Sequence, residues 1–179
     1  MRYRNSSAKE ISFLSLFLAI VIGAQYALSA IPGVEVVTVL FVSYSFSMGK
    51  SRGMVAATAF SFLRQIVFGV FINVFILYIV YFNVLAFIFG AIGNVERKKG
   101  VKRLWLITLC ACVCCIGFTL FDNVLTPVWY GFTWEATKAY FIASLPFLTP
   151  QVVCVFFTVG YLFLPLEKVF SMAAKNLKN

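Results

Sequence analysis

Residues 73–93 read NVFILYIVYFNVLAFIFGAIG and contain no charged side chain. An apolar stretch of about 20 residues is long enough to cross the hydrocarbon core of a bilayer as an α-helix. Only two amides, Asn73 and Asn83, interrupt this run. The stretch therefore predicts a transmembrane helix, and similar stretches before and after it extend that prediction to the whole chain.

The overall composition agrees with a membrane protein. Hydrophobic residues make up 62% of the 179 residues and charged residues only 12%, whereas soluble domains are about 45–50% apolar and about 25% charged. One water-facing core of this size could not hide so much apolar surface, so lipid must be the solvent for much of it. The length fits a single domain, residues 1–179.

Six apolar stretches can be separated by turn residues and charges. The second stretch is short, and a tight turn formed by Gly49–Gly53 leads from it into the third. Thr126–Lys138 is expected to be the longest connection, and Pro146 and Pro150 are expected to bend the last span. We therefore predict an all-α integral membrane protein, a compact bundle of six transmembrane helices, at residues 11–31, 34–48, 53–71, 73–93, 104–125 and 139–164.

The basic residues gather on one side of the membrane when six spans are drawn. With the N-terminus inside, only Lys138 faces outward and Arg64 lies within a span. The positive-inside rule then predicts that both termini are cytoplasmic in the cell membrane. It also accounts for the net charge of +9 without a nucleic-acid partner. The residues expected inside are Arg2, Arg4, Lys9, Lys50, Arg52, Arg97, Lys98, Lys99, Lys102, Arg103, Lys168, Lys175 and Lys178.

The first span has an alternative interpretation as a cleaved signal peptide, because a basic start, an apolar run and Ala27-Leu28-Ser29 resemble a leader with its cleavage site. The run is too long for a typical leader. Its removal would also invert the charge pattern, so we expect the span to be retained.

Ionic and amide side chains are costly inside a membrane and mark candidate functional sites. Here they come from several spans and fall mostly in the outer half of the bilayer, where aromatic residues surround them. We predict an outward-opening pocket for a small molecule. Its candidate residues are Glu35, Arg64, Gln65, Asn73, Asn83, Asp122, Asn123, Trp129 and Gln151. Two alternatives stay open: Arg64 could only neutralise Glu35 or Asp122, and the aromatic residues could only form an interfacial belt.

The first span carries small residues at four-residue spacing: Ser15, Ala19, Gly23 and Ala27. Such a stripe lets another helix approach closely in lipid. It could pack within the bundle or dock a partner subunit.

Catalytic and metal chemistry find little support. The chain has no histidine, and Gly49-Lys50-Ser51 lacks the upstream glycine of a phosphate-binding loop, since Tyr44 stands there. Cys110 and Cys114 share a helix face while Cys112 points away, which is a poor geometry for a metal. We expect no enzyme, no catalytic residue, no metal site and no cofactor. An intramembrane lipid-modifying enzyme is the least supported alternative.

Several stretches together suggest a family. They are the stripe from Ser15 to Ala27, IPGVEVVT at 31–38, the Gly49–Gly53 turn, NVLAFIFGAIG at 83–93 and ASLPF at 143–147, followed by Pro165-Leu166 and lysines. In order and spacing the chain resembles the substrate-binding (S) components of energy-coupling factor (ECF) vitamin transporters.

The resemblance implies a six-helix subunit of an ABC-type importer that binds a vitamin-like ligand on its outer face. Its partners would be a transmembrane coupling subunit and two ATP-binding subunits, with Ala19 and Gly23 at the docking face. The pocket would fall at the outer ends of spans four to six. The ligand is open between cobalamin-like and other vitamins, because no substrate-specific signature is present.

A different class also fits the size and hydropathy: a six-span structural protein of cell-envelope assembly, of the rod-shape-determining type. Such a protein would bind no ligand and would tolerate an Arg64→Leu change.

Overall fold

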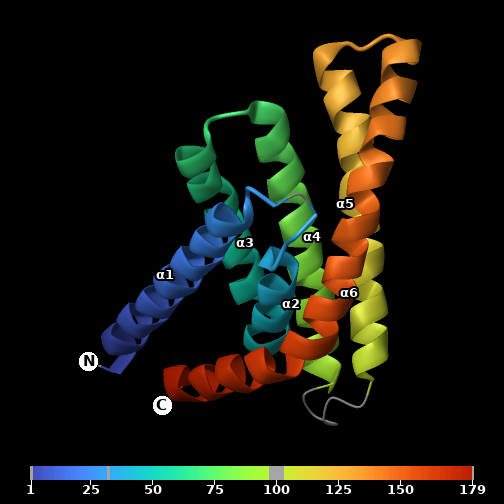
Figure 1. The fold of residues 1–179 in the computed structure, drawn as a ribbon. Coiled ribbons are helices and arrows are strands. Elements are labelled where there is room, and N and C mark those ends of the chain that lie inside the picture. The colour runs from blue at the N-terminus through green and yellow to red at the C-terminus, as the bar shows by residue number, and fades with distance from the viewer. Residues whose placement is uncertain (1, 32, 97–102, 179) are drawn as a thin grey trace.

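The computed structural model describes residues 2–31, 33–96 and 103–178, and within these ranges it contains helices and no strand. The helices are α1 (Arg2–Leu28), α2 (Val37–Met48), α3 (Lys50–Phe68), α4 (Ile72–Glu96), α5 (Leu104–Tyr130) and α6 (Trp134–Lys178). Figure 1 shows α1–α4 grouped together, with the α5–α6 hairpin standing beside them and reaching past the α3–α4 connection.

Among the described residues, four stretches are long and apolar enough to cross a membrane: Ala8–Leu28, Ile72–Glu96, Leu104–Tyr130 and Trp134–Leu177. The prediction of an all-helical protein with several apolar helices suited to a membrane is confirmed at this level. α2, which has 12 residues, is shorter than a bilayer requires. α3 carries Lys50, Arg52 and Arg64 and is not among these four stretches.

α2 is the centre of the bundle, because all 12 of its residues are buried. An apolar helix of about 10–14 residues is typical of a buried core helix. The Phe41 ring lies 5.4 Å from that of Phe17 on α1, 5.1 Å from that of Phe60 on α3 and 4.8 Å from that of Phe82 on α4. One aromatic side chain of α2 thus joins three helices, and α2 holds the surrounding elements in place.

Glycines of α4 bring its backbone into contact with the end of α2 and the start of α3. A Cβ added to Gly93 would lie 2.1 Å from the carbonyl oxygen of Phe46, and one added to Gly90 would lie 2.6 Å from the Lys50 nitrogen. Small residues permit such close helix approach in membranes. The glycines that end the quoted apolar run are therefore packing positions.

Two expected connections are wrong in extent. The tight turn predicted at Gly49–Gly53 is reduced to Gly49 (φ +91°), since α3 begins at Lys50. The long connection predicted at Thr126–Lys138 is mostly helix: α5 continues through Pro127 to Tyr130 and α6 begins at Trp134. Gly131 (φ +64°) ends α5 in a left-handed conformation and donates its N–H to the carbonyl of Val128 at 3.4 Å.

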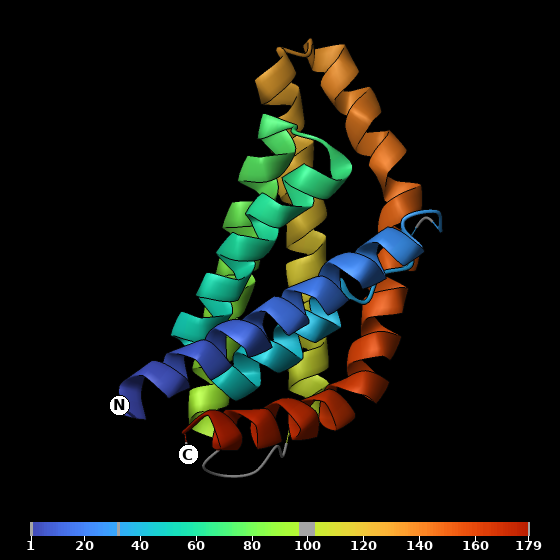
Figure 2. The same ribbon diagram turned by 90° about the vertical axis from the view of Figure 1, so that its left-hand side faces the viewer.

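α6 extends beyond the predicted span and contains Pro146, Pro150 and Pro165. Proline removes a helical hydrogen bond and bends a helix. After Pro165 the helix runs across the end of the bundle (Figures 1 and 2). There the Phe170 ring lies 5.7 Å from that of Phe17 and 5.6 Å from that of Tyr44, so the last turns cover α1 and α2.

The start of α1 and the end of α6 lie at the same end of the bundle (Figure 1). This end carries an ion pair between Arg52 and Glu10, together with Lys9 and the basic residues of the last turns of α6. The opposite end carries Lys138, which lies 3.9 Å from Glu135. Predictions on Arg97, Lys98, Lys99 and Lys102, and on the side chains of Arg2, Arg4 and Lys178, fall outside the described residues.

Candidate functional site

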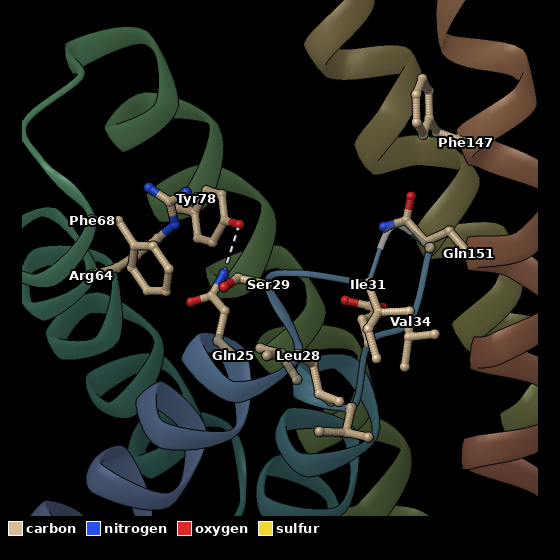
Figure 3. Close-up of a pocket in the computed structure, with 14 residues that line it drawn as sticks. Gln25, Leu28, Ser29, Ile31, Val34, Arg64, Phe68, Tyr78, Phe147 and Gln151 are labelled. Carbon is tan, nitrogen blue, oxygen red and sulfur yellow. Dashed lines mark hydrogen bonds between the residues drawn. The ribbon is translucent and has the colours of Figure 1, made fainter.

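A cavity of about 370 Å³ lies between α3–α4 and α6 and is bordered by the end of α1 and the connection at residues 29–36. We call it the main cavity. Figure 3 shows Arg64, Phe68 and Tyr78 on one wall and Phe147 and Gln151 on the other. A volume of this size is typical of small-molecule sites, which span about 300–1,000 Å³.

Two further hollows adjoin the main cavity. An inner chamber of about 50 Å³ shares Gln25, Glu35, Tyr78 and Gln151 with it. A third hollow, of about 370 Å³, lies between α5 and α6 and shares Gln151 with the main cavity. Small-molecule sites typically combine apolar walls with a few well-placed polar groups. The main cavity likewise combines apolar and polar side chains.

Arg64 forms the charged part of the first wall. Its guanidinium carbon lies 4.1 Å from the centre of the Tyr78 ring and 5.2 Å from that of Phe68. Stacking on aromatic rings stabilises a cation by about 0.5–2 kcal/mol. The guanidinium Nε and Nη1 are nevertheless buried and have no hydrogen-bond acceptor among the described residues. Arg64 is thus held in place by rings while part of its hydrogen-bonding capacity remains free.

Gln25 of α1 extends this wall. Its Nε2 donates a hydrogen bond of 3.0 Å to the Tyr78 hydroxyl, the contact drawn in Figure 3. Its Oε1 is buried and accepts no hydrogen bond from the described residues. The pair therefore links α1 to α4 and leaves one amide oxygen unsatisfied.

Glu35 lies in the connection before α2. Its Oε1 accepts a hydrogen bond of 2.5 Å from the Thr38 hydroxyl. Its backbone N–H donates to Cys154 Sγ at 3.3 Å, and the same thiol donates back to the Glu35 carbonyl at 3.3 Å. The connection is thereby attached to α6, and Glu35 lines both the main cavity and the inner chamber.

Close packing attaches the connection before α2 to α6 at a second point. Gly33 has φ +79°, and a Cβ added there would lie 2.8 Å from the Pro150 ring. Glycine is therefore required for both the backbone angle and the close approach. Pro150 precedes Gln151, so this contact fixes the height at which α6 meets the cavity.

Arg64 forms no structural ion pair with an acid. The ion pairs in the described part of the chain are Arg52–Glu10 and Lys138–Glu135. The alternative in which Arg64 neutralises Glu35 or Asp122 is therefore not supported.

The structure brings together three of the nine predicted site residues, Glu35, Arg64 and Gln151, around the main cavity. Two others serve the α3–α4 hairpin. Gln65 Oε1 accepts a hydrogen bond of 3.0 Å from the Phe71 N–H, and Asn83 Nδ2 donates one of 2.7 Å to the Ile79 carbonyl.

Three more predicted residues link the start of α4, the end of α5 and the first part of α6. Asn73 Nδ2 donates to Thr126 Oγ1 at 3.5 Å, and Thr126 in turn donates to Asp122 at 2.7 Å. Asn123 Nδ2 donates to Ser144 Oγ at 2.8 Å. Asp122 also lines the hollow between α5 and α6. This network acts first as a link between helices.

Trp129 is 47% exposed and lines none of the cavities described above. Its position at the end of α5 fits an interfacial aromatic residue. Sequence reasoning missed Gln25, Phe68 and Phe147 as wall residues. For Gln25 a signal existed, because it is a lone amide in an otherwise apolar run.

The small-residue stripe of α1 faces away from the bundle. Ser15, Ala19, Gly23 and Ala27 are all exposed, and a Cβ added to Gly23 would meet nothing within 4 Å. The opposite face of α1 packs on the core through buried residues such as Val21. The alternative in which the stripe packs within this bundle is therefore wrong.

Comparison with known proteins finds no matching family model, curated protein or solved structure. Within the described ranges no group of three or more His, Cys, Asp or Glu side chains is placed to hold a metal ion.

Proposed function

We propose that the protein is the solute-binding subunit of an ECF-type membrane importer, which captures a vitamin-like micronutrient in the main cavity. The observation that carries this proposal is a cavity of about 370 Å³ with a buried guanidinium whose Nε and Nη1 have no acceptor in the described chain. An unsatisfied buried donor costs about 1–3 kcal/mol. Arg64 also lines this cavity, so its cation can pair there with an anionic group of a bound solute.

The cavity wall favours capture of a small molecule over a purely structural role. Aromatic faces from Phe68, Tyr78 and Phe147 surround the polar groups, and apolar walls with few polar anchors are typical of ligand sites. A scaffold for cell-envelope assembly gains nothing from an unpaired cation inside the membrane.

The proposed topology has six spans, with both termini cytoplasmic in the cell membrane. Support comes from the position of α1's start and α6's end at one end of the bundle and from the basic residues there (Figure 1). α2 and α3 then complete the six spans with α1, α4, α5 and α6, although α2 reaches only part of the bilayer depth.

The proposed partners are a transmembrane coupling subunit and two ATP-binding subunits, which would provide the energy for uptake. The exposed stripe on α1 supports a docking role, since small residues allow close helix approach in lipid. Ala19 and Gly23 are its central positions.

Retention of small molecules tests the proposal. The protein in lipid nanodiscs is incubated with a small-molecule extract of the expression host, washed and denatured, and the released compounds are analysed by mass spectrometry. We expect at least one compound enriched on the wild type and lost from Gln151→Trp, which fills the cavity. The matched control is Tyr161→Trp, on a 75% exposed position of the same helix. No enrichment over Gln151→Trp contradicts the proposal and favours the scaffold.

A further inference from the structure

The main cavity holds two side chains of opposite charge that do not pair with each other. Arg64 and Glu35 both line it, and they are the charged side chains among the described residues that line the main cavity and the inner chamber. The ion pairs of the described chain lie elsewhere, at Arg52–Glu10 and Lys138–Glu135. Neither side chain therefore has a counterion among the residues that the structure describes.

The unpaired atoms of the Arg64 guanidinium are all hydrogen-bond donors and carry a positive charge. Nε and Nη1 of its guanidinium are donors without an acceptor, and guanidinium groups suit carboxylates and phosphates. The two rings against it, Phe68 and Tyr78, supply no acceptor oxygen to those atoms. This wall can therefore receive an anionic group.

The other side of the cavity has the opposite requirement. Glu35 accepts one hydrogen bond from Thr38, and a carboxylate can accept several more. Gln25 Oε1 is a buried oxygen that accepts no hydrogen bond from the described residues. Glu35 and Gln25 both line the main cavity and the inner chamber, so this side of the cavity can receive a protonated nitrogen.

From this arrangement we propose that the captured solute is a zwitterion. Its anionic group lies at Arg64, its basic nitrogen lies toward Glu35 and Gln25, and its apolar body lies against the aromatic walls. The inference rests on the proposed solute-binding function and names the chemical class of the ligand.

Charge balance explains why the other classes are disfavoured. A simple anion would compensate Arg64 and leave the Glu35 carboxylate without a cation. A simple cation would do the reverse. A zwitterion uses both sides of the cavity, because its anionic group pairs with Arg64 and its basic nitrogen donates to Glu35 and Gln25.

The test uses the retention experiment, with the host small-molecule extract as the probe and the acidic and basic groups of each enriched compound as the readout. We expect a compound that carries both an anionic group and a basic nitrogen. Glu35→Gln and Arg64→Gln should each lower its retention about tenfold or more, because each removes a hydrogen bond to a charged group. The matched control is Glu135→Gln, the same change at an 87% exposed side chain, which should leave retention unchanged.

The outcomes separate this inference from the proposed function. An enriched compound with only acidic or only basic groups, or one whose retention Glu35→Gln leaves unchanged, overturns the zwitterion and keeps solute capture. No compound enriched over Gln151→Trp, or lipid and detergent only, overturns solute capture itself. If Glu35→Gln does not elute as a monodisperse protein, the charged groups of the compound recovered from the wild type decide alone.

Discussion

Replacing Arg64 by methionine separates a binding role from a structural one, because the two roles predict opposite effects on the empty protein. The change removes the guanidinium and keeps an unbranched apolar stem against Phe68 and Tyr78. In the empty protein it removes two donors without acceptors, each costing about 1–3 kcal/mol. It also removes stacking on the rings at 4.1 and 5.2 Å, worth about 0.5–2 kcal/mol.

The balance for the empty protein therefore runs from about neutral to stabilising by a few kcal/mol, in line with replacements of buried charges by apolar residues. For the loaded protein the sign reverses. Loss of one hydrogen bond to a charged group costs about 1.5–3 kcal/mol. At about 1.4 kcal/mol per factor of ten, binding should weaken about 10- to 150-fold.

The assay has two parts, thermal unfolding of the ligand-free protein in nanodiscs and retention of the enriched compound. We expect Arg64→Met to keep or raise the unfolding temperature and to lose the compound. Arg103→Met, the same change at the exposed start of α5, is the matched control and should keep both properties. A fall of several degrees in the empty Arg64→Met protein would show that Arg64 is a structural anchor. Retention equal to that of the wild type would refute its role in binding.

Three further predictions follow from packing. Gly23→Trp should abolish cellular uptake of the enriched compound and spare its retention, whereas Gly117→Trp, at an equally open position on α5, should affect neither; equal uptake by both variants would exclude α1 docking. Gly93→Ala should lower the unfolding temperature strongly, because its Cβ would lie 2.1 Å from the Phe46 carbonyl oxygen; an unchanged temperature would contradict the close α2–α4 contact. Cys154→Ala should weaken compound retention at a stability cost of about 1 kcal/mol or less, because it releases the connection before α2; unaltered retention would show that this attachment does not shape the cavity.

The helical framework was largely predictable, because the length of an apolar run depends on bilayer thickness and not on tertiary detail. The run quoted first, 73–93, corresponds to α4 with small changes at its ends. The α5–α6 connection was mispredicted, because Thr126–Lys138 was expected to be a long connection. Pro127 instead lies inside the last turns of α5, and only Gly131 adopts a left-handed angle.

The candidate site was predictable only in part. Position along a helix grouped Arg64 with Gln151, and both residues line the main cavity. The direction in which a side chain points about the helix axis depends on packing, and depth does not determine it. Asn83 therefore shares the depth zone but turns to α3, where it donates to Thr58 Oγ1 at 3.1 Å.

Native mass spectrometry of the protein released from nanodiscs tests the central claim most directly, because it weighs the chain together with what the cavity holds. We predict one small-molecule adduct per chain for the wild type after incubation with the host extract and no adduct for Arg64→Met. A bare wild-type chain, or the same adduct on both proteins, would contradict solute capture by this cavity.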